Sequence, residues 1–215
     1  QHLQALDRIS FSLEAGEVLG FVGESGAGKS LTGAAIMGLL EPPGHITGGS
    51  IMLNGRRIDG DAAAVRGREV GMIFQDPLTS LNPLRTVGDQ LVETIQLHLG
   101  LTGKAAAARA AELLDEVGID RSRIGAYPHE FSGGMRQRIV IALALASEPK
   151  LIIADEPTTA LDVSIQAQVL ALLRRLCKER GAAVILITHD MGVIAETTDR
   201  VAVLYAGRLV ETGVT

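Results

Sequence analysis

Residues 23–30 decide the fold, and they read Gly23-Glu24-Ser25-Gly26-Ala27-Gly28-Lys29-Ser30. The spacing is that of a phosphate-binding loop: a glycine, four residues, then Gly-Lys followed by Ser or Thr. Glycines let backbone N–H groups curl round an anion, and a following helix presents its positive end to the same phosphates. The alternative interpretation is a glycine-rich turn with an exposed lysine.

The residues on both sides of this loop support the first interpretation. Residues 17–22 form a short apolar run that stops at Gly23, which is typical of a buried strand. Residues 31–40 show helical spacing until Pro42 and Pro43 end the pattern. We expect Lys29 to reach the β- and γ-phosphates of a nucleotide, and the Ser30 hydroxyl to ligate Mg²⁺. The predicted nucleotide-binding residues of this segment are Gly23, Glu24, Ser25, Gly26, Ala27, Gly28, Lys29, Ser30 and Leu31.

A second strand ends in two acids. Residues 151–156 read Leu-Ile-Ile-Ala-Asp155-Glu156. In a parallel sheet, these carboxylates would lie at the same edge as the phosphate loop. Asp155 is predicted to hold Mg²⁺, directly or through water, and Glu156 to act as the general base toward the attacking water. A strand that merely ends in acids at a solvated edge is the alternative.

The bulk composition is that of an ordinary globular domain. Hydrophobic residues make up 47% of the 215 residues and charged residues 21%, which excludes an intrinsically disordered chain. The formal net charge of -5 argues against nucleic acid as the main partner. The only cysteine, Cys177, excludes an internal disulfide, fits a reducing compartment and is predicted to lie in a helix.

Short apolar strands alternate with helices along much of the chain, which predicts an α/β fold with a mainly parallel sheet covered on both faces. Residues 50–53, before Asn54-Gly55, predict one arm of an antiparallel hairpin. The further predicted strands are residues 70–74, 151–154, 183–187 and 201–205, and residues 163–180 are a predicted helix.

The stretch from residue 77 to about 147 is predicted to be a mostly helical insertion into this sheet, although Pro77, Asn82 and Pro83 are expected to make the segment 76–86 an irregular loop. Residues 104–117 form an Ala-rich helical pattern that Gly118 ends, and Ser132 is placed to cap a helix at residues 135–146. We therefore divide the chain into a P-loop core at 1–76 and 148–215 and a helical subdomain at 77–147. The chain begins with Gln1 and ends just after a predicted strand, and we expect both ends to be truncated.

The segment Phe131-Ser132-Gly133-Gly134-Met135 resembles the signature motif of ATP-binding cassette (ABC) proteins, whose usual form is Leu-Ser-Gly-Gly-Gln. A serine hydroxyl and bare glycine amides at a helix N-terminus can grip a phosphate, although an ordinary Ser-capped helix looks the same. The resemblance implies that this grip closes over ATP held by a second subunit. Ser132, Gly133 and Gly134 would then act in trans.

Three further landmarks occur in the order that this resemblance implies. Gln75 resembles the glutamine that contacts Mg²⁺ and the attacking water. Ala160-Leu161-Asp162 resembles the loop that crosses between subunits, so Asp162 is predicted to act in trans as well. His189 resembles the switch histidine that contacts the γ-phosphate. The predicted catalytic residues are Glu156, His189, Gln75 and Lys29, and the predicted Mg²⁺ ligands are Ser30, Gln75 and Asp155.

Longer stretches resemble the ATPase subunits of bacterial oligopeptide and dipeptide importers, some relatives of which carry nickel. They are residues 74–83, 127–135 and 154–163. Met135 is usual in that group. The resemblance implies an ATPase, peripheral on the cytoplasmic face of the bacterial inner membrane, in which ATP and Mg²⁺ drive dimer closure. Its expected partners are a second ATPase subunit, identical or related, two membrane-spanning permease subunits and, indirectly, a solute-binding protein.

Two parts of the family pattern are missing, namely an adenine-stacking aromatic residue upstream of the loop and a segment beyond residue 215. Three other functions stay open as alternatives. The first is a non-transport ABC ATPase, which would usually have a long coiled-coil insertion or a basic face. The second is a regulatory module without hydrolysis, which would usually lack Glu156, His189 or the signature glycines. The third is a small-molecule kinase, which would not need the Ser-Gly-Gly segment.

Overall fold

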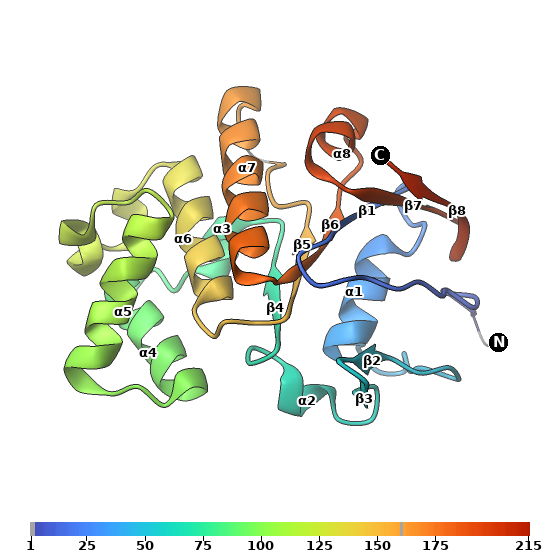
Figure 1. Cartoon of the computed structure of the whole chain (residues 1–215), viewed down its shortest axis with the longest axis horizontal. Coiled ribbons are helices and arrows are strands. Elements are labelled where there is room, and N and C mark those ends of the chain that lie inside the picture. The colour runs from blue at the N-terminus through green and yellow to red at the C-terminus, as the bar shows by residue number, and fades with distance from the viewer. Residues whose placement is uncertain (1–2, 160) are drawn as a thin grey trace.

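The computed structural model describes residues 3–159 and 161–215, and a six-stranded sheet forms its centre (Figure 1). The strand order is β4-β5-β6-β1-β7-β8, in which only β8 runs antiparallel to its neighbour. The strands are β1 (Val18–Val22), β4 (Val70–Ile73), β5 (Leu151–Asp155), β6 (Ala183–Ile187), β7 (Arg200–Tyr205) and β8 (Arg208–Val214). The α/β prediction with a mainly parallel sheet is confirmed.

Helices cover both faces of the sheet. Helix α1 (Lys29–Met37) lies on one face, where Gly33 allows close contact with Ile153 and Ile187. Helices α6 (Gly133–Leu145), α7 (Val163–Arg180) and α8 (Met191–Thr197) belong to the apolar cluster of the opposite face. Because β1, β5 and β6 are parallel, their carboxyl ends meet at one edge, and the chain leaves that edge at Gly23, Glu156 and Thr188.

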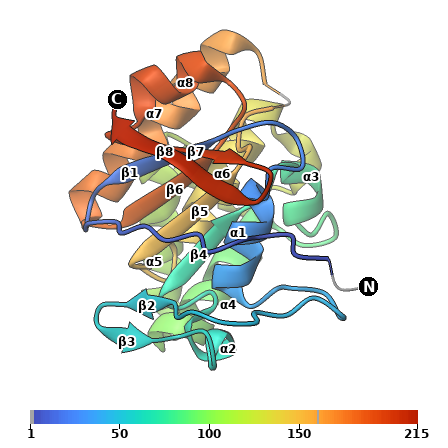
Figure 2. The same cartoon turned by 90° about the vertical axis from the view of Figure 1, so that its right-hand side faces the viewer.

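The stretch between β4 and β5 is mainly helical (Figures 1 and 2). It contains α3 (Pro77–Ser80), α4 (Val87–Leu99), α5 (Gly103–Glu116), two 3₁₀ helices (Arg121–Gly125 and Pro128–Glu130) and α6. One apolar cluster joins these helices to the sheet, with Leu91 and Leu113 on the helical side and Ile73 and Leu186 on the sheet side. The division at 76/77 and 147/148 therefore stays a prediction, because the two parts share one core.

The antiparallel hairpin is short. Strands β2 (Met52–Leu53) and β3 (Arg56–Arg57) pair around Asn54 and Gly55, whose φ angles of 50° and 76° suit a tight hairpin turn. A one-turn helix, α2 (Ala62–Val65), follows. Cys177 lies in a helix, α7, as predicted; it is buried there, and burial raises the pKa of its thiol to about 12.

One local prediction is wrong. We expected the segment 76–86 to be an irregular loop broken by Pro77, Asn82 and Pro83, but it begins with helix α3. Pro77 occupies the first turn of α3, where its missing N–H has no helical partner to lose, and Asp76 caps the helix by accepting from Leu78 N–H at 2.8 Å. Within the described residues, no helix is both long and apolar enough to cross a membrane.

The interior of the helical stretch offers a stability prediction. Leu91 of α4 is 0% exposed, so Leu91→Ala is expected to lower the free energy of unfolding by about 2–5 kcal/mol. The matched control is Leu97→Ala in the same helix, where the leucine is 74% exposed. Its free energy of unfolding should stay within about 0.5 kcal/mol of the wild-type value. Chemical denaturation measures both changes. Equal effects of the two substitutions would contradict the packing of α4 against the core.

Candidate nucleotide-binding site

The loop between β1 and α1 has the backbone of a phosphate cradle. Gly26 and Gly28 have φ angles of 80° and 101°, a region that side chains disfavour. A Cβ atom at Gly23 would lie 2.1 Å from the Leu204 carbonyl oxygen, and one at Gly28 would lie 2.4 Å from the Leu6 side chain. Close packing therefore requires glycine at positions 23 and 28, whereas backbone conformation alone requires it at position 26.

Lys29 lies inside this loop, not on its surface. Its side chain is largely buried, and its ammonium donates to the carbonyl oxygens of Gly23 at 2.7 Å and Glu24 at 3.0 Å. The alternative of a turn with an exposed lysine is thus wrong. These two bonds hold the ammonium at the centre of the loop, where the charge can meet an anion that binds the loop amides.

The Ser30 hydroxyl donates to the Asp155 Oδ1 atom at 3.0 Å, so the acidic strand end reaches the phosphate loop. Burial raises the pKa of the Asp155 carboxyl above its ordinary 3.8. The Ser30 hydrogen bond acts in the opposite direction, the neighbouring Glu156 charge raises the pKa further, and the Lys29 charge lowers it. A hydroxyl and a carboxylate are the hard oxygen ligands that Mg²⁺ prefers, and Mg²⁺ commonly takes one or two carboxylates plus substrate phosphates. The residues present therefore fit such an ion.

The raised pKa makes Asp155 a cost to stability near neutral pH. Since the folded chain binds the proton more tightly than the unfolded chain, the contribution of Asp155 to stability falls as the pH rises above about 3.8. We expect Asp155→Asn to raise the thermal midpoint of the nucleotide-free chain at pH 7, and this gain to shrink at pH 4. Thermal melts at both pH values measure this gain.

The matched control is Asp120→Asn, at an exposed carboxyl whose pKa is lowered by hydrogen bonds to Ser122. The thermal midpoint of this variant at pH 7 should fall or stay the same. A midpoint that also falls for Asp155→Asn would contradict the prediction.

Glu156 is the centre of a cluster of polar side chains. Its Oε2 atom accepts from Gln75 Nε2 at 3.2 Å and from the Thr159 hydroxyl at 3.0 Å, and its Oε1 atom lies 3.1 Å from His189 Nδ1. The backbone at Glu156 has a φ of 46°, which is rare for a residue with a side chain, and its N–H donates to the Ile187 carbonyl oxygen at 2.9 Å. The structure thus brings together Glu156, Gln75 and His189 from the ends of three strands.

A cavity of about 690 Å³ lies over the phosphate loop. The sequence-predicted residues on its wall are Ser25, Gly26, Gly28, Lys29, Ser30, Leu31, Glu156 and His189. Five further lining residues were missed, namely Leu3, Gln4, Ala5, Ala206 and Gly207. They come together because Asp7 N–H donates to the Gly207 carbonyl oxygen at 2.7 Å across 200 residues of sequence, so no local pattern could have revealed them. Thr159 was also missed, although a hydroxyl three residues after Glu156 was a usable signal.

The residues predicted to act in trans form a separate exposed cluster. Ser132 caps α6, with its hydroxyl accepting from Met135 N–H at 3.4 Å, and Asp162 stands at the N-cap of α7. Gly134 meets α7 closely, since a Cβ atom there would lie 2.6 Å from Ile165. Ser132, Gly133, Gly134 and Asp162 do not line the cavity over the phosphate loop. Ala160 of the predicted crossing loop lies outside the described residues.

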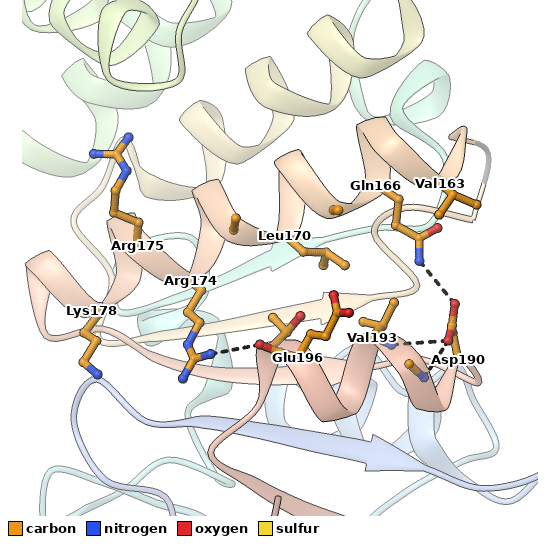
Figure 3. Close-up of a pocket in the computed structure, with 13 residues that line it drawn as sticks. Val163, Gln166, Leu170, Arg174, Arg175, Lys178, Asp190, Val193 and Glu196 are labelled. Atoms are coloured by element: carbon orange, nitrogen blue, oxygen red, sulfur yellow. Dashed lines mark hydrogen bonds between the residues drawn. The ribbon is translucent and has the colours of Figure 1, made fainter.

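A second cavity of about 490 Å³ lies between α7 and α8 (Figure 3). Leu170 and Val193 contribute apolar surface, Arg174 donates to the Glu196 carbonyl oxygen at 3.0 Å, and Gln166 donates to Asp190 at 3.4 Å. Asp190 also caps α8, directly after His189. The hydrogen bonds of Asp190 therefore stabilise the start of α8. None of the phosphate-loop residues lines this second cavity.

Comparison with known proteins agrees with this geometry. The family model described as ABC transporter matches residues 6–159. The chain is 54% identical to the oligopeptide transport ATP-binding protein OppD of Bacillus subtilis (strain 168), covering 98% of the chain and 61% of OppD. It is 50% identical to the dipeptide transport ATP-binding protein DppD of Escherichia coli (strain K12), covering 98% of the chain and 66% of DppD. The chain thus spans less than two thirds of the length of either relative.

The fold also resembles that of a solved cassette. A dimeric ATP-binding cassette in a post-hydrolysis state, bound to ADP and Pi, superposes with a TM-score of 0.82 at 28% identity, covering 98% of this chain and 90% of that one. The family model spans the phosphate loop, the signature segment and the acidic strand end, the same three features that the sequence singled out. The chain therefore belongs to the ABC transporter family, as an ATP-binding cassette.

Proposed function

We propose that this chain is the ATP-hydrolysing domain of an importer for dipeptides or oligopeptides. The observation that carries the proposal is the position of Glu156, whose carboxylate lies between Gln75 and His189 beside the phosphate loop. A general base must lie within hydrogen-bond reach of the proton it takes, and Glu156 lines the cavity where the terminal phosphate would bind. The cargo class comes from the names of the relatives, OppD and DppD.

The residues present suit hydrolysis of the terminal phosphoanhydride. Loop amides and the Lys29 ammonium would hold the β- and γ-phosphates. Ser30 and Asp155, with Gln75, would hold Mg²⁺, which supplies charge neutralisation on the phosphate oxygens when bound. Glu156 accepts a proton from a water whose oxygen attacks the γ-phosphorus, while the bond from that phosphorus to the bridging oxygen breaks. Gln75 and His189 orient the Glu156 carboxylate and contact the transferred group.

A complete site requires a second cassette. Ser132, Gly133 and Asp162 are exposed, and neither they nor Gly134 line this chain's own cavity, so we infer that they serve a nucleotide held by a partner cassette, identical or related. Head-to-tail pairing would join each phosphate loop to the Ser132 and Gly134 of its partner. The dimeric cassette bound to ADP and Pi supports this arrangement.

The test is the mass in solution of Glu156→Gln, measured by light scattering with MgATP and then with MgADP. We expect twice the monomer mass with MgATP alone, because binding without hydrolysis holds the sandwich closed. The control is Glu156→Gln combined with Gly133→Val, at an exposed position where an added Cβ atom would make only an ordinary contact, 3.5 Å from Leu161. This variant blocks the signature surface and should stay monomeric. A monomer in both nucleotides, with ATP shown to bind, would contradict self-pairing; co-expression with a related ATPase subunit then tests the heterodimer.

The membrane partners are a further part of the proposal. Phe74, Leu78 and Leu84 are exposed apolar side chains around the segment 74–84, directly beside Gln75. We propose that this surface receives a helix of one of two membrane-spanning permease subunits, on the cytoplasmic face of the bacterial inner membrane. Cassette closure would then drive alternating access, and a solute-binding protein would deliver the cargo from the other side.

A further inference from the structure

Gln137 is a buried polar side chain that the proposed chemistry does not use. It lies in α6, is 0% exposed, and neither its amide nitrogen nor its amide oxygen has a hydrogen-bond partner among the residues that the structure describes. Buried amides are nearly always paired, so an unpaired one points to a role outside simple packing. Gln90, also buried in α4, is the ordinary case: its amide bonds Asn82, Arg85 and Thr86.

The position of Gln137 on α6 follows from helical spacing. Residues 133, 137 and 144 lie on one side of the helix, because they are separated by four and seven positions. At one end of this side, a Cβ atom on Gly133 would lie 3.5 Å from Leu161; at the other end, a Cβ atom on Gly71 would lie 2.9 Å from the Ala144 carbonyl oxygen. Gln137 therefore faces the sheet between the start of β4 and the segment that follows β5.

The level along the sheet can be estimated as well. Gln137 lies seven residues before Ala144, about 10 Å along the axis of α6. Since α6 contacts β4 and its C-terminal turn meets Gly71 near the start of that strand, Gln137 lies level with the carboxyl ends of β4 and β5. The segments that leave those ends carry Gln75 and Glu156, and their residues Pro77, Pro157 and Thr158 are buried.

We propose that Gln137 is a positioning residue that connects the signature helix α6 to the segment carrying Glu156. The inference rests on the proposed ATP hydrolysis. When ATP draws the signature helix toward a partner cassette, the Gln137 amide bonds backbone groups of residues 157–159, and this fixes Glu156 against the attacking water. In the single chain, the amide has no hydrogen-bond partner among the described residues, so closure would add hydrogen bonds that the single chain lacks.

The experiment compares Gln137→Met with the wild type and with the control Gln90→Met. Methionine has a similar shape without the amide, and replacing an unpaired buried amide by an apolar group is neutral or stabilising. We expect the thermal midpoint of Gln137→Met to be unchanged or higher, ATP affinity within about twofold, KM unchanged and kcat lower by about tenfold, the scale of a coupling residue. Gln90→Met should lower the midpoint and leave kcat of the folded fraction unchanged.

Hydrogen exchange at the backbone amides of Thr158 and Thr159 gives a readout besides turnover. MgATP should protect these amides in Glu156→Gln and fail to protect them in Glu156→Gln combined with Gln137→Met. Wild-type kcat in Gln137→Met, or equal protection with and without Gln137, would overturn the inference, as would a kcat that falls only in step with the thermal midpoint. Gln137→Leu repeats the test if the methionine variant does not fold. Failure of the proposed function is distinguishable from failure of this inference about Gln137, because the wild type itself would then not hydrolyse ATP.

Discussion

The Glu156→Gln variant is expected to hydrolyse ATP at least ~10²-fold more slowly than the wild type, the scale typical of losing a general base. The amide keeps the shape of the carboxylate but cannot accept the proton from water. The contacts with Gln75 and His189 involve the two carboxylate oxygens, so the substitution removes the charge from the centre of the cluster. ATP affinity should stay close to that of the wild type, because Glu156 does not belong to the phosphate loop.

Steady-state phosphate release measures the turnover, and calorimetric titration measures the affinity. The control is Glu179→Gln, at an exposed carboxylate of α7 that pairs with Arg175, and it should leave turnover unchanged. Near-normal turnover of Glu156→Gln would show that another group takes the proton.

The Lys29→Met variant is expected to lose both affinity and turnover, with turnover lower by about 10²–10³-fold, the scale of removing a preorganised charge from the transition state. The ammonium does two things in the structure. It brings a positive charge to the centre of the loop, and it ties the Gly23 and Glu24 carbonyl groups together, so its loss also loosens the cradle. Weaker ATP binding should therefore accompany the slower hydrolysis.

Methionine preserves the apolar part of the lysine side chain, so the largely buried site should stay filled. Lys178→Met, on the exposed side of α7, changes the net charge equally and should have no effect on either quantity. Unchanged ATP affinity in Lys29→Met would contradict the placement of the nucleotide phosphates in this loop.

Local patterns predicted the regular elements well where burial follows a simple period. The helix at residues 163–180 and the strand at 183–187 have the predicted bounds, because a helical apolar stripe and a continuous buried run are both local signals. The prediction for the segment 76–86 is wrong, because proline in the first turn of a helix is favourable and Pro77 begins α3 instead of breaking regular structure. A proline alone does not show whether a helix begins or regular structure is interrupted; the Asp76 cap before Pro77 shows that a helix begins.

The prediction of the candidate site divides in the same way, into residues that local motifs identify and contacts that they do not. Motif spacing identified Lys29, Ser30, Asp155 and Glu156, because phosphate and Mg²⁺ chemistry requires those residue types at those places. The resemblance to a known family added Gln75 and His189, and the structure brings both to the Glu156 carboxylate. The local sequences around Gln75 and His189 give no sign that both side chains contact Glu156 across the ends of separate strands.

The sequence by itself determined the class of fold, the phosphate loop and the identity of the acids, because each depends on residues close together along the chain. Tertiary structure alone decided three other features: the left-handed backbone at Glu156 with its bond to Ile187, the cavity wall from residues 3–5 and 206–207, and the burial of Gln137 with no hydrogen-bond partner among the described residues. The physical reason is that strand pairing and helix packing bring together groups that are distant in sequence, and the pairing of a buried polar group depends on all its neighbours at once.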